Sequence, residues 1–285
     1  MSETANPRPE TKVQHVAILD TDVLVPATQS AYGRYFSALY EKLLGAAAKQ
    51  LDLSHLVRFT AWDVVSGSYP DLAEVDAILI TGSIAAAYDT DPWIQTLASF
   101  IQQVYVSHPR VRIFGTCFGH QLIGQVLLGP HGAVVEKDPN GYEFGVQTIN
   151  LNQKLVEDFP CLGRLGQVEP TSGSSPHGLR LQMCHGDHVA LPVPPGELPG
   201  NWVNIGGSAH CKVQGLYEPS RVLTLQPHFE CDQVVMEETV KYFYTPEKGF
   251  SEEFLQRAFA AIRKEDDAIV AAEWVLRFLM GISTK

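Results

Sequence analysis

The residues best suited to chemistry surround Cys117, in the stretch Phe-Gly-Thr-Cys-Phe-Gly-His-Gln at 114–121. An apolar run precedes this stretch, and a second apolar run of helical length follows it. This order predicts a strand, a sharp turn and a helix, with Cys117 at the turn between two glycines. Small residues let the backbone bend tightly and present a nucleophile at the end of a strand. The backbone N–H of Phe118 would then point at a developing oxyanion.

A second group of candidate residues is His228-Phe229-Glu230, which follows a predicted strand at 222–225. If this group extends the strand, alternation places the side chains of His228 and Glu230 on one face. A thiol nucleophile needs a histidine base, and a carboxylate can hold the tautomer of that histidine. Neither motif is specific alone, because free cysteines are often buried in packing and H-x-E is common in polar loops.

These residues require a scaffold that brings strand ends together. Short apolar runs predict strands at 13–19, 53–59, 75–80 and 111–114, and helices at 32–49, 92–106 and 118–128. This alternation favours the parallel α/β class, in which sites form at the carboxyl ends of strands. Thr81-Gly82-Ser83 and Cys117 both lie at such ends.

The middle of the chain predicts a smaller antiparallel part. Runs at 133–137 and 142–151 flank Asp138-Pro139-Asn140-Gly141, a strong turn signal, and together predict a hairpin. Residues 168–178 are rich in Ser, Gly and Pro and predict an exposed loop. The remaining elements are expected as strands at 179–184, 202–205, 209–217 and 222–225, and helices at 232–244, 251–264 and 268–280.

Composition narrows the class of protein. The 285 residues carry a net charge of −11 without a basic cluster, which argues against nucleic acid and anionic membranes as partners. The polar first fourteen residues predict no signal peptide, and no run is long enough to span a bilayer. Five cysteines without a C-x-x-C pair argue against a disulfide framework or a zinc ribbon. We therefore predict a cytoplasmic protein with no metal and no cofactor.

In combination, the motifs resemble those of the class I glutamine amidotransferases. The likeness is greatest to stand-alone members related to the glutaminase domain of GMP synthetase and to γ-glutamyl peptidases. It covers about residues 13–244 and includes G-T-C-F-G-H-Q, M-C-H-G-D-H-V, Q-P-H-F-E and the stretch at 80–93. The resemblance implies a flavodoxin-like α/β fold, with a mostly parallel central sheet flanked by helices. It divides the chain into a flexible tail at 1–12, an amidotransferase-like domain at 13–244 and a helical extension at 245–285 packed on that domain.

The resemblance also implies roles for single residues. Cys117 would be the nucleophile, His228 the base and Glu230 the group that orients it. The other site positions would surround the substrate: Gly82 and Phe118 as the oxyanion hole, with Gln121, His185, Gly186 and Asp187 as substrate contacts.

The chain departs from the family pattern at two places. Phe229 stands where the family usually has Pro, and Thr81-Gly82-Ser83 stands where many members have Gly-Gly-Pro. A residue between the base and its carboxylate should tolerate change if its side chain points away from the site. Gly82 keeps the position at which the backbone must approach the substrate.

Three functions are compatible with these residues. The first is a thiol hydrolase or transferase that cleaves a small γ-glutamyl amide, glutamine or a γ-glutamyl peptide, through a thioester on Cys117. The second is a glutaminase subunit that delivers ammonia to a separate synthase. The protein partners compatible with these readings are such a synthase or further copies of the same chain in a homo-oligomer. The third is a pseudoenzyme that binds a metabolite or partner. The stretch after Glu230 is too short for an ATP-pyrophosphatase domain and has no G-x-x-x-x-G-K-[ST] loop. The intact Cys-His-Glu set favours the first function.

Overall fold

The computed structural model describes residues 12–169, 174–192 and 198–282. All but Lys12 of the predicted tail at 1–12 lies outside these residues. The central element is a seven-stranded sheet with the order β2-β1-β3-β4-β12-β11-β9. Its parallel strands are β2 (Val57–Asp63), β1 (Gln14–Asp20), β3 (Ala77–Ile80), β4 (Arg112–Thr116) and β12 (Val222–Leu225). β11 (Leu216–Glu218) runs antiparallel to β12, and β9 (Val203–Asn204) antiparallel to β11. The predicted α/β class with a mostly parallel sheet is confirmed.

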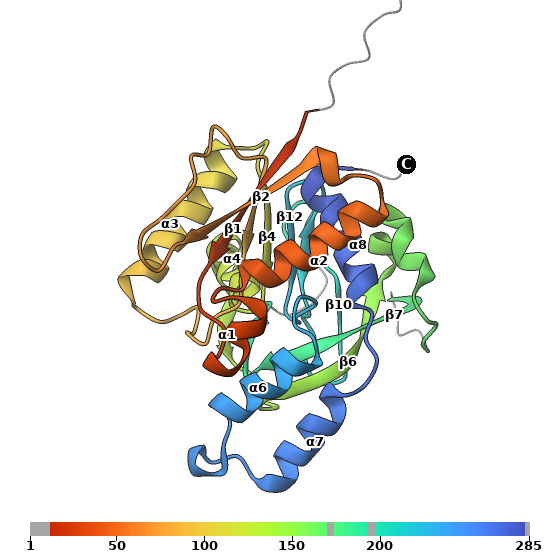
Figure 1. Ribbon diagram of the computed structural model, residues 1–285. Coiled ribbons are helices and arrows are strands. Elements are labelled where there is room, and N and C mark those ends of the chain that lie inside the picture. The colour runs from red at the N-terminus through yellow and green to blue at the C-terminus, as the bar shows by residue number, and fades with distance from the viewer. Residues whose placement is uncertain (1–11, 170–173, 193–197, 283–285) are drawn as a thin grey trace, which may run out of the picture.

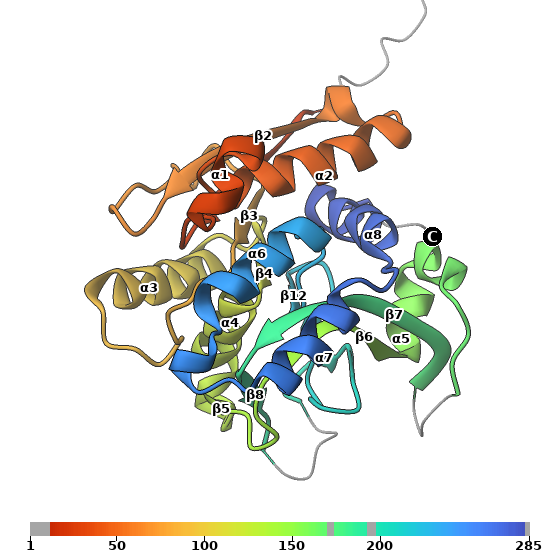
Figure 2. The ribbon, with the colours of Figure 1, turned by 60° about the horizontal axis from the view of Figure 1, so that its bottom comes forward.

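Helices cover both faces of this sheet (Figure 1 and Figure 2). α2 (Ser37–Gln50) and α8 (Ala268–Met280) lie on one face, and α3 (Pro92–Ser107) and α4 (Phe118–Leu128) lie on the other. Successive side chains of a strand point to opposite helical layers. In β1, Val16 and Ile18 pack with the first pair of helices, and Ala17 packs with the second. β1, β3 and β12 are buried on both faces, so their sequences are largely apolar, whereas the edge strand β2 is only partly buried and mixes polar with apolar residues.

A smaller antiparallel sheet has the order β10-β6-β7. Its strands are β10 (Gly206–Gly207), β6 (Glu143–Asn152) and β7 (Ser174–His185). β5 (Val134–Lys137) pairs instead with β8 (Asp187–Ala190), so the predicted hairpin between 133–137 and 142–151 is wrong. The turn at 138–141 connects β5, which pairs with β8, to β6, which pairs with β7. The backbone N–H of Asp138 donates to the carbonyl of Gly186 at 2.8 Å, next to the start of β8.

Other boundaries differ from the sequence expectation for local reasons. Residues 54–56 form a 3₁₀ turn, so the strand expected at 53–59 begins at Val57. The strand expected at 209–217 is mostly a loop, because the backbone N–H of Ser208 donates to the carbonyl of Cys211 at 2.8 Å and closes a turn. The short remaining elements are α1 (Pro26–Tyr32), α5 (Gln153–Asp158), η1 (Ser54–Leu56), η2 (Gly129–His131), η3 (Pro160–Arg164) and η4 (Pro246–Lys248).

The helices that end the chain pack on both sheets. α7 (Glu252–Ile262) lies against β6 and α6 (Gln233–Phe243), as Figure 2 shows. α8 belongs to the main hydrophobic core, where Trp274 is fully buried in one cluster with residues of β1 and β4. These contacts support the proposal that 245–285 belongs to the same domain as 13–244. Among the described residues, no helix has both the length and the apolar character needed to cross a bilayer.

The packing of α8 predicts a large difference between two positions on this helix. Trp274→Ala should lower the free energy of unfolding by about 3–5 kcal/mol, since it leaves a cavity in the core. Ile269→Ala is the matched control, because Ile269 is 68% exposed on the same helix and should change stability by less than about 0.5 kcal/mol. Urea unfolding followed by circular dichroism measures both. Equal effects at the two positions would contradict the placement of α8.

Candidate active site

Cys117 lies at a sharp turn between β4 and α4. Its backbone has φ 48° and ψ −110°, a strained conformation for a residue other than glycine. The neighbouring glycines make this turn possible, since a Cβ on Gly119 would lie 2.5 Å from the carbonyl oxygen of Ile80. The backbone N–H of Cys117 donates to the carbonyl of Leu225 at 2.8 Å, which ties the turn to β12. The strain therefore presents the Cys117 side chain at the carboxyl end of the sheet.

His228 and Glu230 form a buried pair, with 2.6 Å between Nδ1 of His228 and Oε1 of Glu230. They do not extend β12, which ends at Leu225. Instead the backbone N–H of His228 donates to the carbonyl of Gln182 in β7 at 2.8 Å, so the smaller sheet helps to fix this histidine.

The side chain of Phe229 points away from this pair and into the core. Its ring centroid lies 5.6 Å from that of Tyr40 and 6.0 Å from that of Phe114, both in edge-to-face contact. The residue between His228 and Glu230 in the sequence is therefore a core residue, and its side chain packs on Tyr40 and Phe114.

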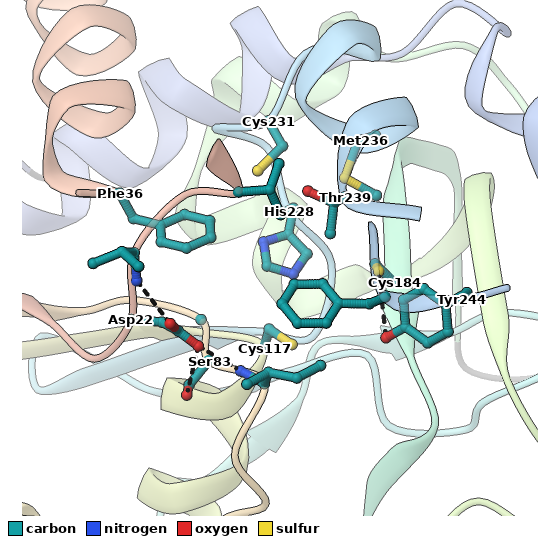
Figure 3. A pocket seen from close by; sticks show the side chains of 15 residues that line it. Asp22, Phe36, Ser83, Cys117, Cys184, His228, Cys231, Met236, Thr239 and Tyr244 are labelled. Atoms are coloured by element: carbon teal, nitrogen blue, oxygen red, sulfur yellow. Dashed lines mark hydrogen bonds between the residues drawn. The ribbon is translucent and has the colours of Figure 1, made fainter. Parts of the chain in front are cut away.

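Gly82, Cys117 and His228 converge at the ends of β3, β4 and β12. A Cβ on Gly82 would lie 2.8 Å from Cε1 of His228 and 3.5 Å from Cβ of Cys117. In Figure 3 the ring of His228 points toward Cys117. The hydroxyl of Thr21 donates to the carbonyl of Gly82 at 2.9 Å and holds this backbone in place. Only glycine fits at position 82 without a shift of the histidine ring.

The charges at this point favour an imidazolium next to the Cys117 sulfur. Burial lowers the pKa of His228, but the charge of Glu230 and the interaction with Cys117 outweigh it and raise that pKa well above its ordinary value. Burial, followed by the charge of Glu230, also raises the pKa of Tyr40, so this phenol stays neutral beside the carboxylate. Since Glu230 accepts from Nδ1, the Nε2–H of His228 is left for Cys117, and a cationic partner stabilises a thiolate.

A cleft opens over Cys117 (Figure 3). Its walls come from the ends of β1 and β3, the start of α2, and α6. Its apolar lining comes from Val23, Val25, Phe36, Ile84, Met236 and Phe243. The polar lining comes from Asp22, Ser83, Cys184, Cys231, Thr239 and Tyr244, besides Cys117 and His228.

Asp22 is a site residue that sequence reasoning did not select. Its carboxylate accepts from the hydroxyl of Ser83 at 3.2 Å and from the backbone N–H of Ile84 at 2.9 Å, which fixes the loop carrying Gly82. The available signal was its position directly after the first strand, at the same sheet edge as Cys117.

The predicted substrate contacts lie together but outside the cleft lining. Nε2 of Gln121 donates to the carbonyl of Asp187 at 3.0 Å. Nδ1 of His185 lies 3.0 Å from the same carbonyl oxygen. Gly186 packs on Tyr142, where a Cβ would lie 2.6 Å from the ring. Gln121 and His185 therefore hold the 185–187 segment in position through protein contacts.

A buried carboxylate, Glu143 of β6, contacts His185, the first residue of this segment. Its Oε2 lies 2.9 Å from Nε2 of His185, and it accepts from the Ser208 hydroxyl at 2.6 Å and from Nε2 of Gln214 at 2.8 Å. Burial raises the pKa of Glu143, but these hydrogen bonds outweigh it and lower the pKa overall. The sequence offered no signal for this role, because a single glutamate at the start of a strand is usually exposed.

Comparison with known proteins shows which sequences and folds this chain is similar to. No family model matches the chain. A glutamine amidotransferase-like protein of Schizosaccharomyces pombe is 28% identical over 279 residues, covering 93% of this chain and 98% of that protein. γ-Glutamyl peptidase 3 of Arabidopsis thaliana is 26% identical over 260 residues, covering 89% of this chain and 91% of the peptidase.

Solved structures with low identity show the same fold. A glutamine amidotransferase of Thermotoga maritima superposes with a TM-score of 0.63 at 18% identity, covering 95% of this chain and 99% of that chain. A glutamine amidotransferase of Methylobacillus flagellatus gives a TM-score of 0.62 at 17% identity and covers 97% of each chain. The resemblance seen in the motifs is thus confirmed: the chain is similar over most of its length to glutamine amidotransferase-like proteins and γ-glutamyl peptidases, and it has the fold of solved glutamine amidotransferases.

Proposed function

We propose that this protein is a thiol hydrolase or transferase that cleaves γ-glutamyl amides, with Cys117, His228 and Glu230 as its catalytic triad. The observation that carries the proposal is the strained turn at Cys117, next to a buried histidine whose Nδ1 is 2.6 Å from the carboxylate of Glu230. The names of the relatives support a γ-glutamyl amide as the substrate class.

The reaction begins with attack of the Cys117 thiolate on the γ-carbonyl carbon. A C–S bond forms, and the π electrons of the carbonyl move to its oxygen, where the backbone N–H groups of Gly82 and Phe118 would stabilise the charge. Nε2–H of His228 then gives its proton to the departing amine as the C–N bond breaks. The products of this half-reaction are the free amine and a γ-glutamyl thioester.

Neutral His228 completes the cycle. It removes a proton from water, whose oxygen attacks the thioester carbonyl. The C–S bond breaks, glutamate leaves, and the thiolate–imidazolium pair is restored. A second amine in place of water would give transfer instead of hydrolysis. Glu230 holds Nδ1–H throughout and stabilises the imidazolium in both steps.

The cleft supports an organic leaving group. Phe36, Met236 and Phe243 provide an apolar wall beside Cys117, and apolar walls bind carbon-containing groups. Ammonia would leave such a wall uncovered, whereas the amine side of a γ-glutamyl peptide would fill it. We therefore favour the peptidase function over a subunit that delivers ammonia. All five cysteines are free, which supports a reducing compartment such as the cytosol.

The purified chain should act without a partner protein. We expect incubation with γ-glutamyl dipeptides to release the free amine, and kcat/KM to be higher for these than for glutamine, because only the dipeptide contacts the apolar wall. Amino-acid analysis of glutamate and of the leaving amine, together with an ammonia assay for glutamine, measures both.

Two cysteine variants make this experiment specific. Cys117→Ala should abolish turnover, whereas Cys161→Ala should keep it, because Cys161 is a buried thiol packed in the hydrophobic core outside the cleft. Activity that appears only after a co-purifying protein is added would favour the ammonia-delivering subunit. Activity in Cys117→Ala equal to the wild type would refute the mechanism.

The role of Glu230 predicts a shift in the pH profile. The negative charge of Glu230 raises the pKa of His228, so Glu230→Gln should lower that pKa. His228 would then lose its proton at lower pH, and the alkaline limb of kcat/KM should move to lower pH. The maximum rate should fall by about 100-fold or more.

Glu238→Gln is the control for this variant, since Glu238 lies on α6, part-exposed and paired with Lys241. It should leave the profile unchanged. An alkaline limb that stays in place in Glu230→Gln, with the fold intact by circular dichroism, would show that Glu230 does not act through His228.

A further inference from the structure

Three side chains of types that can bind transition metals lie close together, away from the proposed catalytic triad. Within the described part of the chain, one ligand atom each of Asp138, His188 and Cys211 lies within 4.8 Å of the other two. They come from separate segments: the turn after β5, strand β8 and the loop between β10 and β11. Asp138 is 5% exposed and Cys211 is 1% exposed, while His188 is partly exposed, so two of the three side chains are buried.

One oxygen of the buried carboxylate has no hydrogen-bond partner. Oδ1 of Asp138 accepts from the backbone N–H of Asn140 at 2.8 Å, but Oδ2 has no partner among the residues that the structure describes. Its neighbours are Nδ1 of His188 at 3.6 Å and Nε2 of His210 at 3.8 Å, both beyond hydrogen-bond distance. An unpartnered buried carboxylate oxygen is costly, and a bound cation would remove that cost.

The distance between the Asp138 and His188 ligand atoms fits zinc. Ligands lie about 2.0–2.3 Å from Zn²⁺, so two ligands of a tetrahedral site are about 3.3–3.8 Å apart. The distance of 3.6 Å between Oδ2 of Asp138 and Nδ1 of His188 falls in this range. Thiolate, imidazole and carboxylate are also the three ligand types that zinc uses.

The other nitrogen of His188 has the surroundings of a metal-bound histidine. Nε2 is buried without a hydrogen-bond partner in the described residues, and Oε1 of Glu136 lies 3.7 Å from it. Histidines that bind metals usually donate their second N–H to a carboxylate, which fixes the ring. A small movement of the exposed Glu136 side chain would complete that hydrogen bond.

We propose that Asp138, His188 and Cys211 form a zinc site, with water as the fourth ligand. Binding would remove the proton of the Cys211 thiol, which now faces the carbonyl of Val213 at 3.5 Å, and release it to solvent. Water completes the tetrahedron because Nε2 of His210 is already engaged with the carbonyl of Gly141 at 3.1 Å. The sequence alone predicts no metal, because these three residues follow no ligand-spacing motif.

Such an ion would stabilise the 186–188 segment, which includes two of the proposed substrate contacts. His188 directly follows Asp187, and the backbone N–H of Asp138 donates to the carbonyl of Gly186 at 2.8 Å. Zinc would therefore tie the 186–188 segment to the turn after β5 and to the loop at 208–214. Its role would be structural, since the ligands lie outside the lining of the cleft over Cys117.

Metal titration of the chelator-treated full chain tests this proposal. Isothermal titration calorimetry with zinc sulfate should give one ion per wild-type chain, and binding should raise the Tm. Cys211→Ser and Asp138→Asn should each weaken zinc by about 100-fold, and Glu136→Gln by about 10-fold. Cobalt(II) substitution gives an independent readout, because a thiolate–cobalt charge-transfer band should appear in the wild type and vanish in Cys211→Ser.

Cysteine controls separate this site from the catalytic pocket. Cys161→Ser, Cys231→Ser and the inactive Cys117→Ala should all keep one zinc and the cobalt band, so the result does not depend on the proposed reaction. Cys231 is the critical control, because it lies within 4.8 Å of ligand atoms of His228 and Glu230. If Cys211→Ser does not fold, His188→Gln replaces it. Absence of stoichiometric zinc in the wild type, or loss of the metal in Cys231→Ser but not in Cys211→Ser, would overturn the proposal.

Discussion

The close approach of Gly82, Cys117 and His228 is the constraint on which the rest of the structure depends. Three strands far apart in sequence, β3, β4 and β12, are neighbours in one parallel sheet, so their carboxyl ends meet at one edge. A methyl group at position 82 would already collide with the ring of His228, at 2.8 Å. The buried strands and the four helices that cover them supply the rigidity that keeps Cys117 in its strained conformation.

The second sheet has a supporting part in this arrangement. The backbone of His228 is anchored to β7 through Gln182, and β6 carries the Glu143 carboxylate that holds His185. His228 and the 185–187 segment are therefore both held by the same pair of antiparallel strands. A substitution that loosens β6 or β7 would disturb both the proposed base and the proposed substrate segment, although neither strand contributes a residue of the proposed triad.

Local sequence patterns were sufficient for the elements that depend on local chemistry. The turn at Cys117 is marked by its glycines, and α8 by its apolar run, so both appear where the sequence places them. Pairing between distant segments could not be predicted from local patterns. β5 pairs with β8 rather than with β6, although the turn signal between β5 and β6 is strong. The same reason explains why the sequence did not predict the roles of Asp22, Glu143 and the Asp138–His188–Cys211 cluster. Each of them contacts partners that are distant in sequence and that only the fold brings near.

The most direct test of the account is to trap the covalent intermediate. Wild-type protein is mixed with a γ-glutamyl dipeptide labelled in the glutamyl half, quenched in acid within the first turnover, digested and analysed by mass spectrometry. The account predicts a γ-glutamyl adduct on the peptide that contains Cys117, formed and consumed at rates that match turnover. The pocket thiols Cys184 and Cys231 serve as internal controls, because burial raises the pKa of each, to about 11 and about 12. An adduct on either of them, or turnover without any adduct on Cys117, would contradict it.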